Sequence, residues 1–231
     1  MNKIARFSLP ATLILALLSS PARAKSYTAV PGLEGQNTKL KIKFVKYTGG
    51  ATGKMVVKVK NTGKHGARFK ARGLYFVPNG DPESAPQRLG AAGPYEVEEQ
   101  GKWRRTEDMM IPPGAERELR LQVFCIDSHR SSPGNKQGFQ VARERMPAEL
   151  RSKISSGAKA IIKKNKGKVD SANSEIQGYI WETRDKKWIK LQGERKQEKS
   201  PRLNRSSMGN SLPQAISPQQ GEGAVQQRQS R

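Results

Sequence analysis

The chain has 231 residues, with 43 Lys and Arg against 20 Asp and Glu, and a formal net charge of +23. That length accommodates one domain of ordinary size, or one domain with flexible ends. One cysteine and two histidines exclude a disulfide scaffold, a zinc finger and an iron–sulfur site within a single chain. Because 34% of the residues are hydrophobic, the chain can bury a modest core.

Residues 1–24 have the three-part pattern of a cleavable secretory signal peptide. Lys3 and Arg6 form a positive start, an apolar stretch covers residues 7–18, and the Ala-Arg-Ala sequence at 22–24 provides a cleavage site. The apolar stretch is too short for a stable membrane span, although an uncleaved anchor helix is the alternative. We therefore expect a secreted or periplasmic protein of net charge +20, without a transmembrane segment after cleavage.

Residues 25–140 show short runs of alternating apolar and polar residues, the pattern of antiparallel β-strands. The runs lie at 40–45, 55–60, 73–77, 95–98, around Trp103 and at 118–126, and Gly- or Pro-containing turns separate most of them. A polar connection is expected to end near residue 94. Six or seven short strands of this kind predict an immunoglobulin-like β-sandwich.

From about residue 141 the hydrophobic period becomes helical, and two amphipathic helices are predicted to pack on the sandwich. The first begins near Pro147, ends before Gly167 and has as its apolar face Leu150, Ile154, Ala158, Ile161 and Ile162. The second begins near Asp170 or Ser174, and its inner stripe is Ile176, Tyr179, Ile180 and Thr183. A turn at 184–187 and a short strand at 188–191 complete this segment, 141–192. Residues 193–231, rich in Gln, Ser and Pro, are predicted to form a disordered basic tail.

The single cysteine, Cys125, ends the last predicted strand, and Asp127 and His129 follow it. If the chain stays extended, these three side chains share one face, because side chains alternate along a strand. Such a face suits a Cys–His nucleophile pair or a metal site. A buried apolar thiol and a disulfide between two chains are the other interpretations. Of these, we expect no metal ion, and no cofactor is implied.

Cys125 also has a downstream partner in Gln177, within the segment 176–181. Four features occur in order: a strand ending in Phe-Cys with an acidic residue two positions on, a downstream proline, a basic helix and a Gln-x-x-Ile-Trp motif. Together they resemble the thioester domains of secreted and surface bacterial proteins. The resemblance covers about residues 119–183, and Ile176 and Tyr179 stand where that family has Thr and Ala. It implies an internal thioester between Cys125 and Gln177, with neighbours Asp127, His129 and Trp181.

The second candidate site is the basic surface. Lysine and arginine occur on predicted strand faces and on one helix face, at Lys41, Lys43, Lys58, Lys60, Arg104, Arg105, Lys159, Lys163 and Lys164. Such a field attracts polyanions through counterion release. Outside the cytoplasm these are acidic polysaccharide, lipopolysaccharide, an anionic membrane surface or extracellular DNA, and an envelope protein is the other partner to expect. No nucleic-acid motif is present, so sequence-specific nucleic-acid binding is not expected.

No catalytic triad, nucleotide-binding loop or carboxylate pair is recognisable, and we therefore do not expect an enzyme. The residues favour an exported, strongly basic, noncatalytic binding or structural module of the cell envelope or the extracellular space. The alternative is a covalent, adhesin-like module that uses a thioester between Cys125 and Gln177.

Overall fold

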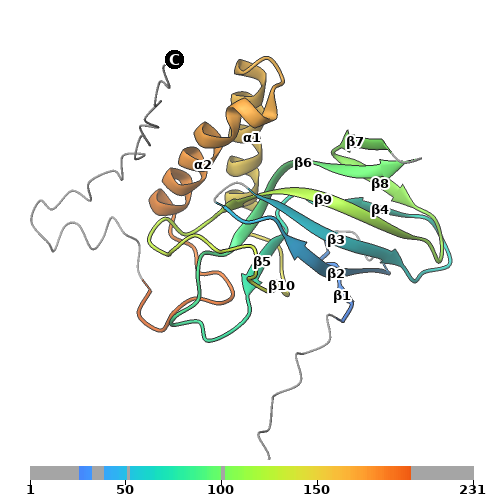
Figure 1. Ribbon diagram of the computed structural model, residues 1–231, viewed down its shortest axis with the longest axis horizontal. Coiled ribbons are helices and arrows are strands. Elements are labelled where there is room, and N and C mark those ends of the chain that lie inside the picture. Colours follow the sequence, from blue (N-terminus) through green and yellow to red (C-terminus); the bar gives the residue numbers. More distant parts are fainter. Residues whose placement is uncertain (1–25, 33–38, 51–52, 100–101, 199–231) are drawn as a thin grey trace, which may run out of the picture.

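The computed structural model describes residues 26–32, 39–50, 53–99 and 102–198. The predicted signal peptide and residues 199–231 of the predicted tail lie outside them. The strands are β1 (Thr28–Ala29), β2 (Leu40–Tyr47), β3 (Lys54–Asn61), β4 (Ala67–Lys70), β5 (Tyr75–Pro78), β6 (Leu89–Glu99), β7 (Lys102–Thr106), β8 (Asp108–Ile111), β9 (Glu116–Cys125) and β10 (Phe139–Val141). The helices are α1 (Ala148–Lys164) and α2 (Val169–Lys186). Figure 1 shows the two helices side by side at one end of a curved sheet.

The main sheet is antiparallel and has the order β1–β2–β3–β9–β6–β5–β10, with β7 paired to β6. It curls until its ends approach one another. The Phe139 ring of β10 lies edge-on to Phe44 and Tyr47 of β2, with centroids 5.8 and 5.6 Å apart. The register of β2 shifts between Phe44 and Lys46, and such a bulge bends and twists a strand. The fold is thus mostly β and nearly barrel-shaped, and the predicted immunoglobulin-like sandwich is not confirmed.

From Leu121 onward, strand β9 is buried on both faces and separates two hydrophobic cores. Leu119, Leu121, Val123 and Cys125 belong to the core inside the curled sheet, which the β4–β8 pair also lines with Phe69 and Ile111. Phe124 and Ile126 belong to a second core beneath the helices. Because side chains alternate along a strand, a strand covered on both sides reads as a continuous apolar run. This explains the apolar sequence 123–126.

The helices cover the outer face of the sheet with the stripes expected from their sequence. Leu150, Ile154 and Ala158 of α1 are buried in the second core, as are Ile176 and Ile180 of α2. The first helix begins directly after Pro147, as predicted. The second begins at Val169, close to the Asp170 alternative, so Ser174 lies inside it.

Several local predictions are wrong. Strands β4, β8 and β10 were not predicted, because each is only three or four residues long and its pairing comes from distant segments. The expected polar connection to residue 94 contains the start of β6 at Leu89, where small residues conceal the strand pattern. The expected turn at 184–187 lies mostly in α2, which continues to Lys186.

The C-terminal segment also differs from expectation. Residues 188–191 are irregular rather than a strand, and residues 193–198 pack on the domain instead of beginning the tail. We call residues 188–198 the C-terminal strap. Hydrogen bonds and ion pairs of polar side chains hold the strap to the domain, so the hydrophobic periodicity of the sequence does not predict that it is attached.

The helix pair yields a prediction at Gly157. A Cβ atom there would lie 2.0 Å from Cε1 of the Tyr179 ring. We expect Gly157→Ala to lower the free energy of unfolding by about 1–3 kcal/mol, because forced repacking outweighs the gain in helix propensity. Urea unfolding measures the change.

The matched control is Gly178→Ala in α2, where no atom lies within 4 Å of the added Cβ. This variant should gain about 0.5–1 kcal/mol, because glycine is unfavourable inside a helix. Removing the ring in the double variant Gly157→Ala/Tyr179→Ala should make the alanine at 157 harmless. Equal stability of Gly157→Ala and Gly178→Ala would contradict the close approach of α1 and α2 at Gly157 and Tyr179.

Candidate functional site

The structure brings Gln177 of α2 to Cys125 at the end of β9, although 52 positions separate them. The Gln177 side-chain oxygen accepts the Cys125 backbone N–H at 2.9 Å, and its nitrogen donates to the Cys125 carbonyl at 2.8 Å. The pairing of β3 with β9 stops at Gln122, so Cys125 extends beyond β3. The Gln177 carboxamide therefore takes the place of a strand partner for the buried backbone of Cys125.

The Cys125 thiol lies fully buried in the core of the curled sheet. Burial raises its pKa to about 12; a hydrogen bond with Ser132 lowers it, whereas the Asp127 charge raises it further. The thiol is therefore protonated near neutral pH. Since the thiolate is the reactive form of cysteine, Cys125 is unreactive in this state.

Asp127 and His129 do not continue the face of Cys125, because β9 ends at Cys125 and a turn follows. Asp127 binds the guanidinium of Arg88. The described contacts of His129 are with Glu198, at 2.5 Å, and with the Trp188 ring, at 5.5 Å between centroids. The prediction that the three side chains share a face is thus wrong, and with it the geometric basis of a Cys–His pair.

Trp181 is placed as a neighbour of the candidate pair. Its ring packs against the same core as Cys125, and its Nε1 donates to the side-chain oxygen of Gln87 at 3.1 Å. Sequence reasoning missed Gln87, which is buried just before β6. Tyr179 lies elsewhere, against Gly157, and its hydroxyl donates to the Lys153 carbonyl at 3.1 Å. The tyrosine is therefore accommodated against α1.

A buried ionic network lies behind the loop that follows Cys125. Arg88 and Asp127 are both 0% exposed and form a bidentate pair, with Nε–Oδ2 at 2.7 Å and Nη2–Oδ1 at 2.5 Å. Arg88 Nη1 also donates to the carbonyls of Leu191 and Gln192, at 3.2 Å each. One arginine thus joins the start of β6, the loop after β9 and the C-terminal strap.

Two glutamates of the strap complete this network. Glu194 binds Arg184 at 3.0 Å, and the Arg184 guanidinium lies 4.0 Å from the centroid of the Trp188 ring. Glu198 accepts from Arg130 Nε at 2.6 Å, and its side chain is 1% exposed. The one sequence signal for these residues is the presence of acids in a basic segment, and that signal does not identify their partners.

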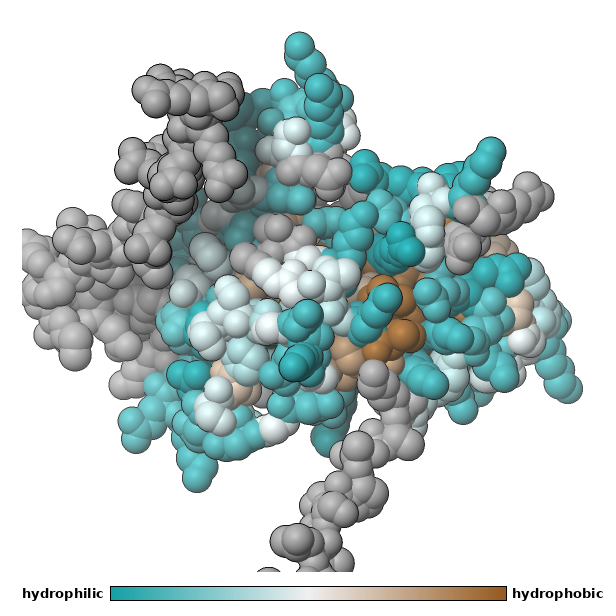
Figure 2. Space-filling model, viewed as in Figure 1, coloured by the Kyte–Doolittle hydropathy of each residue, from teal (hydrophilic) through white to brown (hydrophobic). Residues whose placement is uncertain are grey.

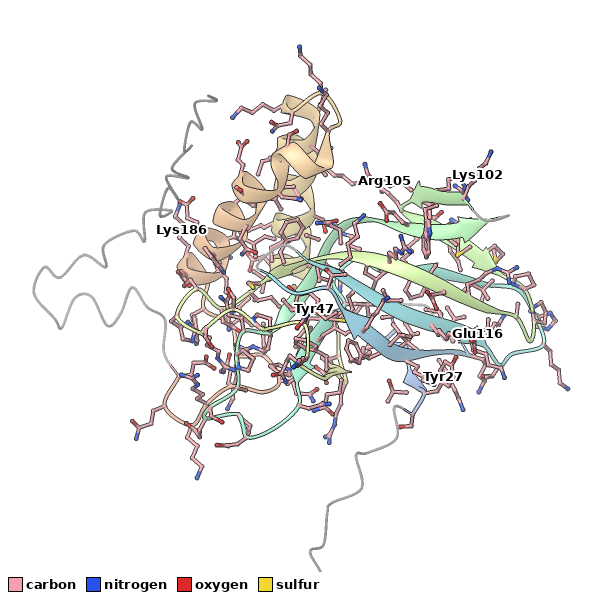
Figure 3. All side chains as sticks on the ribbon, viewed as in Figure 1. Tyr27, Tyr47, Lys102, Arg105, Glu116 and Lys186 are labelled. Atoms are coloured by element: carbon pink, nitrogen blue, oxygen red, sulfur yellow. The ribbon has the colours of Figure 1, made fainter. Side chains whose placement is uncertain are left out.

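The predicted polyanion-binding residues divide into one cluster and several separate positions. Lys41 lies directly opposite Lys60, and Lys43 opposite Lys58, on neighbouring strands β2 and β3. Figure 3 labels Tyr27 and Glu116, which are in contact beside this cluster, and shows Arg105 far from it on β7. Among the others, three bind acids: Arg105 with Glu96, Lys159 with Glu107 and Lys164 with Glu175.

Within the cluster, the two strands differ in their compensation. The β3 lysines face glutamates of β9, with Lys58 opposite Glu118 and Lys60 opposite Glu116. On the other side of β2, Lys41 lies opposite Ala29, and Lys43 Nζ lies 5.7 Å from the centre of the Tyr27 ring. The face seen in Figure 2 is mainly hydrophilic, with one hydrophobic area over the middle of β2 and β3.

In the described segments, no group of three or more His, Cys, Asp or Glu side chains is arranged to hold a metal ion. Neither α1 nor α2 has the length and apolar character that crossing a bilayer requires. Comparison of the chain with protein-family models, curated proteins and solved structures finds no match in any of the three. The likeness to thioester domains stays an interpretation of residues 119–183.

The strap predicts a loss of stability in acid. Burial alone would raise the pKa of Glu198, but hydrogen bonds from His129 and Arg130 and the charge of Arg88 hold it far below its usual range. As the pH falls below about 5, the unfolded chain takes up a proton that folded Glu198 refuses. The contribution of Glu198 is complete above its unfolded pKa and declines by up to about 1.4 kcal/mol per pH unit below it.

Glu198→Gln should therefore flatten the acid side of the pH–stability curve measured by thermal unfolding. It should also be less stable at neutral pH by about 3–5 kcal/mol, because it leaves buried arginine charge unpaired. Glu107→Gln, which removes only an exposed pair with Lys159, is the control and should keep the original profile. An unchanged acid slope in Glu198→Gln would show that the strap carboxylate does not contribute.

Proposed function

We propose that this protein is a noncatalytic module that binds polyanionic surfaces through the outer face of β2 and β3. The observation that carries the proposal is the placement of lysine directly opposite lysine, Lys41 with Lys60 and Lys43 with Lys58. Like charges in this position destabilise a sheet. A bound polyanion relieves that repulsion, so the arrangement favours binding over stability.

The spacing of these lysines suits a chain with repeating negative charges. Neighbouring strands lie about 4.8 Å apart, and alternate residues on one strand about 6.6–6.8 Å apart, so the four lysines extend from one compact patch of the sheet. Lys41 and Lys43 carry most of the uncompensated charge, because the glutamates of β9 face the lysines of β3. Acidic polysaccharide, lipopolysaccharide and anionic membrane surfaces are the ligands that match this charge, in the envelope location that residues 1–24 predict.

This function is tested with the double variant Lys41→Gln/Lys43→Gln on a heparin column and in a titration at several salt concentrations. Elution should shift to lower salt, and the slope of log K against log salt should fall by about one for each lysine that contacts the polyanion. The free energy of unfolding should stay equal or rise, because repulsion across β2 and β3 is removed.

Lys159→Gln/Lys164→Gln removes the same charge from α1, where both lysines bind acids, and is the control. It should elute close to the parent protein. If both double variants lose binding equally, net charge alone governs retention and the β2–β3 site does not exist.

A second candidate function is covalent attachment through a thioester, and the contact between Gln177 and Cys125 favours it. In that reaction the Cys125 sulfur attacks Cδ of Gln177, the Sγ–Cδ bond forms, the Cδ–Nε2 bond breaks, and ammonia leaves with the thiol proton. An amine or hydroxyl of a partner then attacks Cδ, the Sγ–Cδ bond breaks, and the proton of the attacking group goes to sulfur. The surrounding core excludes water, which protects such a bond. A neutral thiol and a Gln177 carboxamide that makes two hydrogen bonds to the Cys125 backbone are equally consistent with a purely structural role, in which Gln177 holds α2 to the end of β9.

Covalent attachment predicts an intact mass lower by one ammonia and a thiol that resists alkylation in denaturant. Methylamine should add to the chain at Gln177. Cys125→Ala and Gln177→Ala should each abolish the loss of ammonia and the addition of methylamine, since each removes one end of the bond. An intact mass without loss of ammonia, together with a thiol that can be alkylated, would overturn covalent attachment and leave the hydrogen bonds of Gln177 to Cys125 with a purely structural role.

A further inference from the structure

A cavity of about 450 Å³ lies between β5, the segment that leads into α1, and the C-terminal strap. Its size is within the range of about 300–1,000 Å³ found for small-ligand sites. Arg143, Arg145 and Lys190 line it together with one acid, Glu144, and the hydroxyl-bearing Tyr75. The lining therefore carries an excess of positive charge, and none of the residues of the β2–β3 cluster belongs to it.

Arg145 is the most constrained of these cations. Its guanidinium donates to three main-chain carbonyls, of Pro31 at 2.9 Å, Arg72 at 2.5 Å and Lys70 at 2.9 Å. Burial lowers the pKa of Arg145 to about 10, and the nearby charge of Arg151 contributes. Its described partners are thus dipoles rather than a carboxylate, and a negative charge in the cavity would compensate it.

The other features of the cavity also favour an anion. The backbone N–H of Arg143 binds the Gln192 side-chain oxygen at 2.7 Å, which orders the main chain at the lining. Tyr75 Oη accepts the Gln192 N–H at 3.0 Å, so its own proton can be donated to a ligand. Pro147, at the rim, precedes the first residue of α1, a helix of 17 residues whose N-terminus has no side-chain cap. The positive end of the helix dipole thus adds to the charges of the side chains.

From this geometry we propose that the cavity binds a sugar-sized ligand that carries a carboxylate or phosphate group, held by Arg143 and Lys190, with the buried charge of Arg145 adding to the attraction. The forked guanidinium of arginine binds either group in a bidentate manner, and lysine adds a point charge. The Tyr75 hydroxyl supplies a further donor. This inference rests on the proposed function for its class of ligand, since one acidic unit of a polysaccharide fits the site. It depends on different residues, so the two can fail separately.

The test is isothermal titration of the full chain with glucuronate, glucose 6-phosphate and neutral glucose, at constant ionic strength set with sodium chloride. Both anionic sugars should bind and glucose should not; the tighter of the two identifies carboxylate or phosphate as the preferred group. Arg143→Gln and Lys190→Gln should each weaken binding about tenfold or more, because each removes a charge-assisted hydrogen bond. Arg145 is left unchanged because it holds three carbonyls of the fold.

Lys41→Gln/Lys43→Gln is the matched control, which should lose retention on heparin but bind the anionic sugars like the parent chain. The proposal is overturned if neither anionic sugar binds, if glucose binds equally well, or if the Arg143 and Lys190 variants titrate unchanged. Loss of sugar binding in the Lys41/Lys43 variant alone would assign the sugars to the strand face. If the Lys41→Gln/Lys43→Gln variant binds the anionic sugars and also elutes from heparin like the parent chain, the proposed function is overturned and the proposed cavity site stands.

Discussion

The buried pair of Arg88 and Asp127 is the interaction on which the arrangement of this domain depends. Two fully buried charges are tolerated only because each compensates the other, and removing one partner of such a pair costs about 3–5 kcal/mol. Arg88 also binds the strap carbonyls of Leu191 and Gln192. The pair therefore joins the sheet, the loop after Cys125 and the C-terminal strap, and it holds Leu191 and Gln192, which line the cavity.

The position of Cys125 at the end of strand β9 explains why its thiol is unreactive. Its alternate side chains enter two different cores, so Cys125 is enclosed by the curled sheet while Phe124 faces the helices. The same enclosure that would protect a thioester from water also keeps the thiol protonated. In the thiol state the Gln177 carboxamide binds the buried backbone N–H and carbonyl of Cys125. A thioester would lose Nε2 and with it the bond to the carbonyl, so the chemical state of Cys125 distinguishes attachment from support.

The positive charge of the chain has several structural roles. Arg88, Arg130 and Arg184 are buried and bind acids inside the fold, and Lys159 and Lys164 bind glutamates at the surface. Lys41 and Lys43 lie opposite other lysines, and Arg143 and Lys190 line a cavity. The last two groups are the ones that we propose offer their charge to a ligand. A count of basic residues predicts a polyanion as the class of ligand but does not locate the sites.

Local periodicity was sufficient to predict the strands around residues 40–60 and 116–126, both helices and their buried stripes, because burial on one or both faces imposes a repeat that can be read along the chain. Cys125 was singled out as the one cysteine of the sequence, and Gln177 by the resemblance to thioester domains. Tertiary structure decided the closure of the sheet and the formation of the short strands β4, β8 and β10. It also decided that Arg88, Arg130 and Arg184 bind the strap and that Lys41 lies opposite Lys60. These features join segments far apart in sequence through pairing register and polar contacts, and neither leaves a periodic signal in the residues themselves.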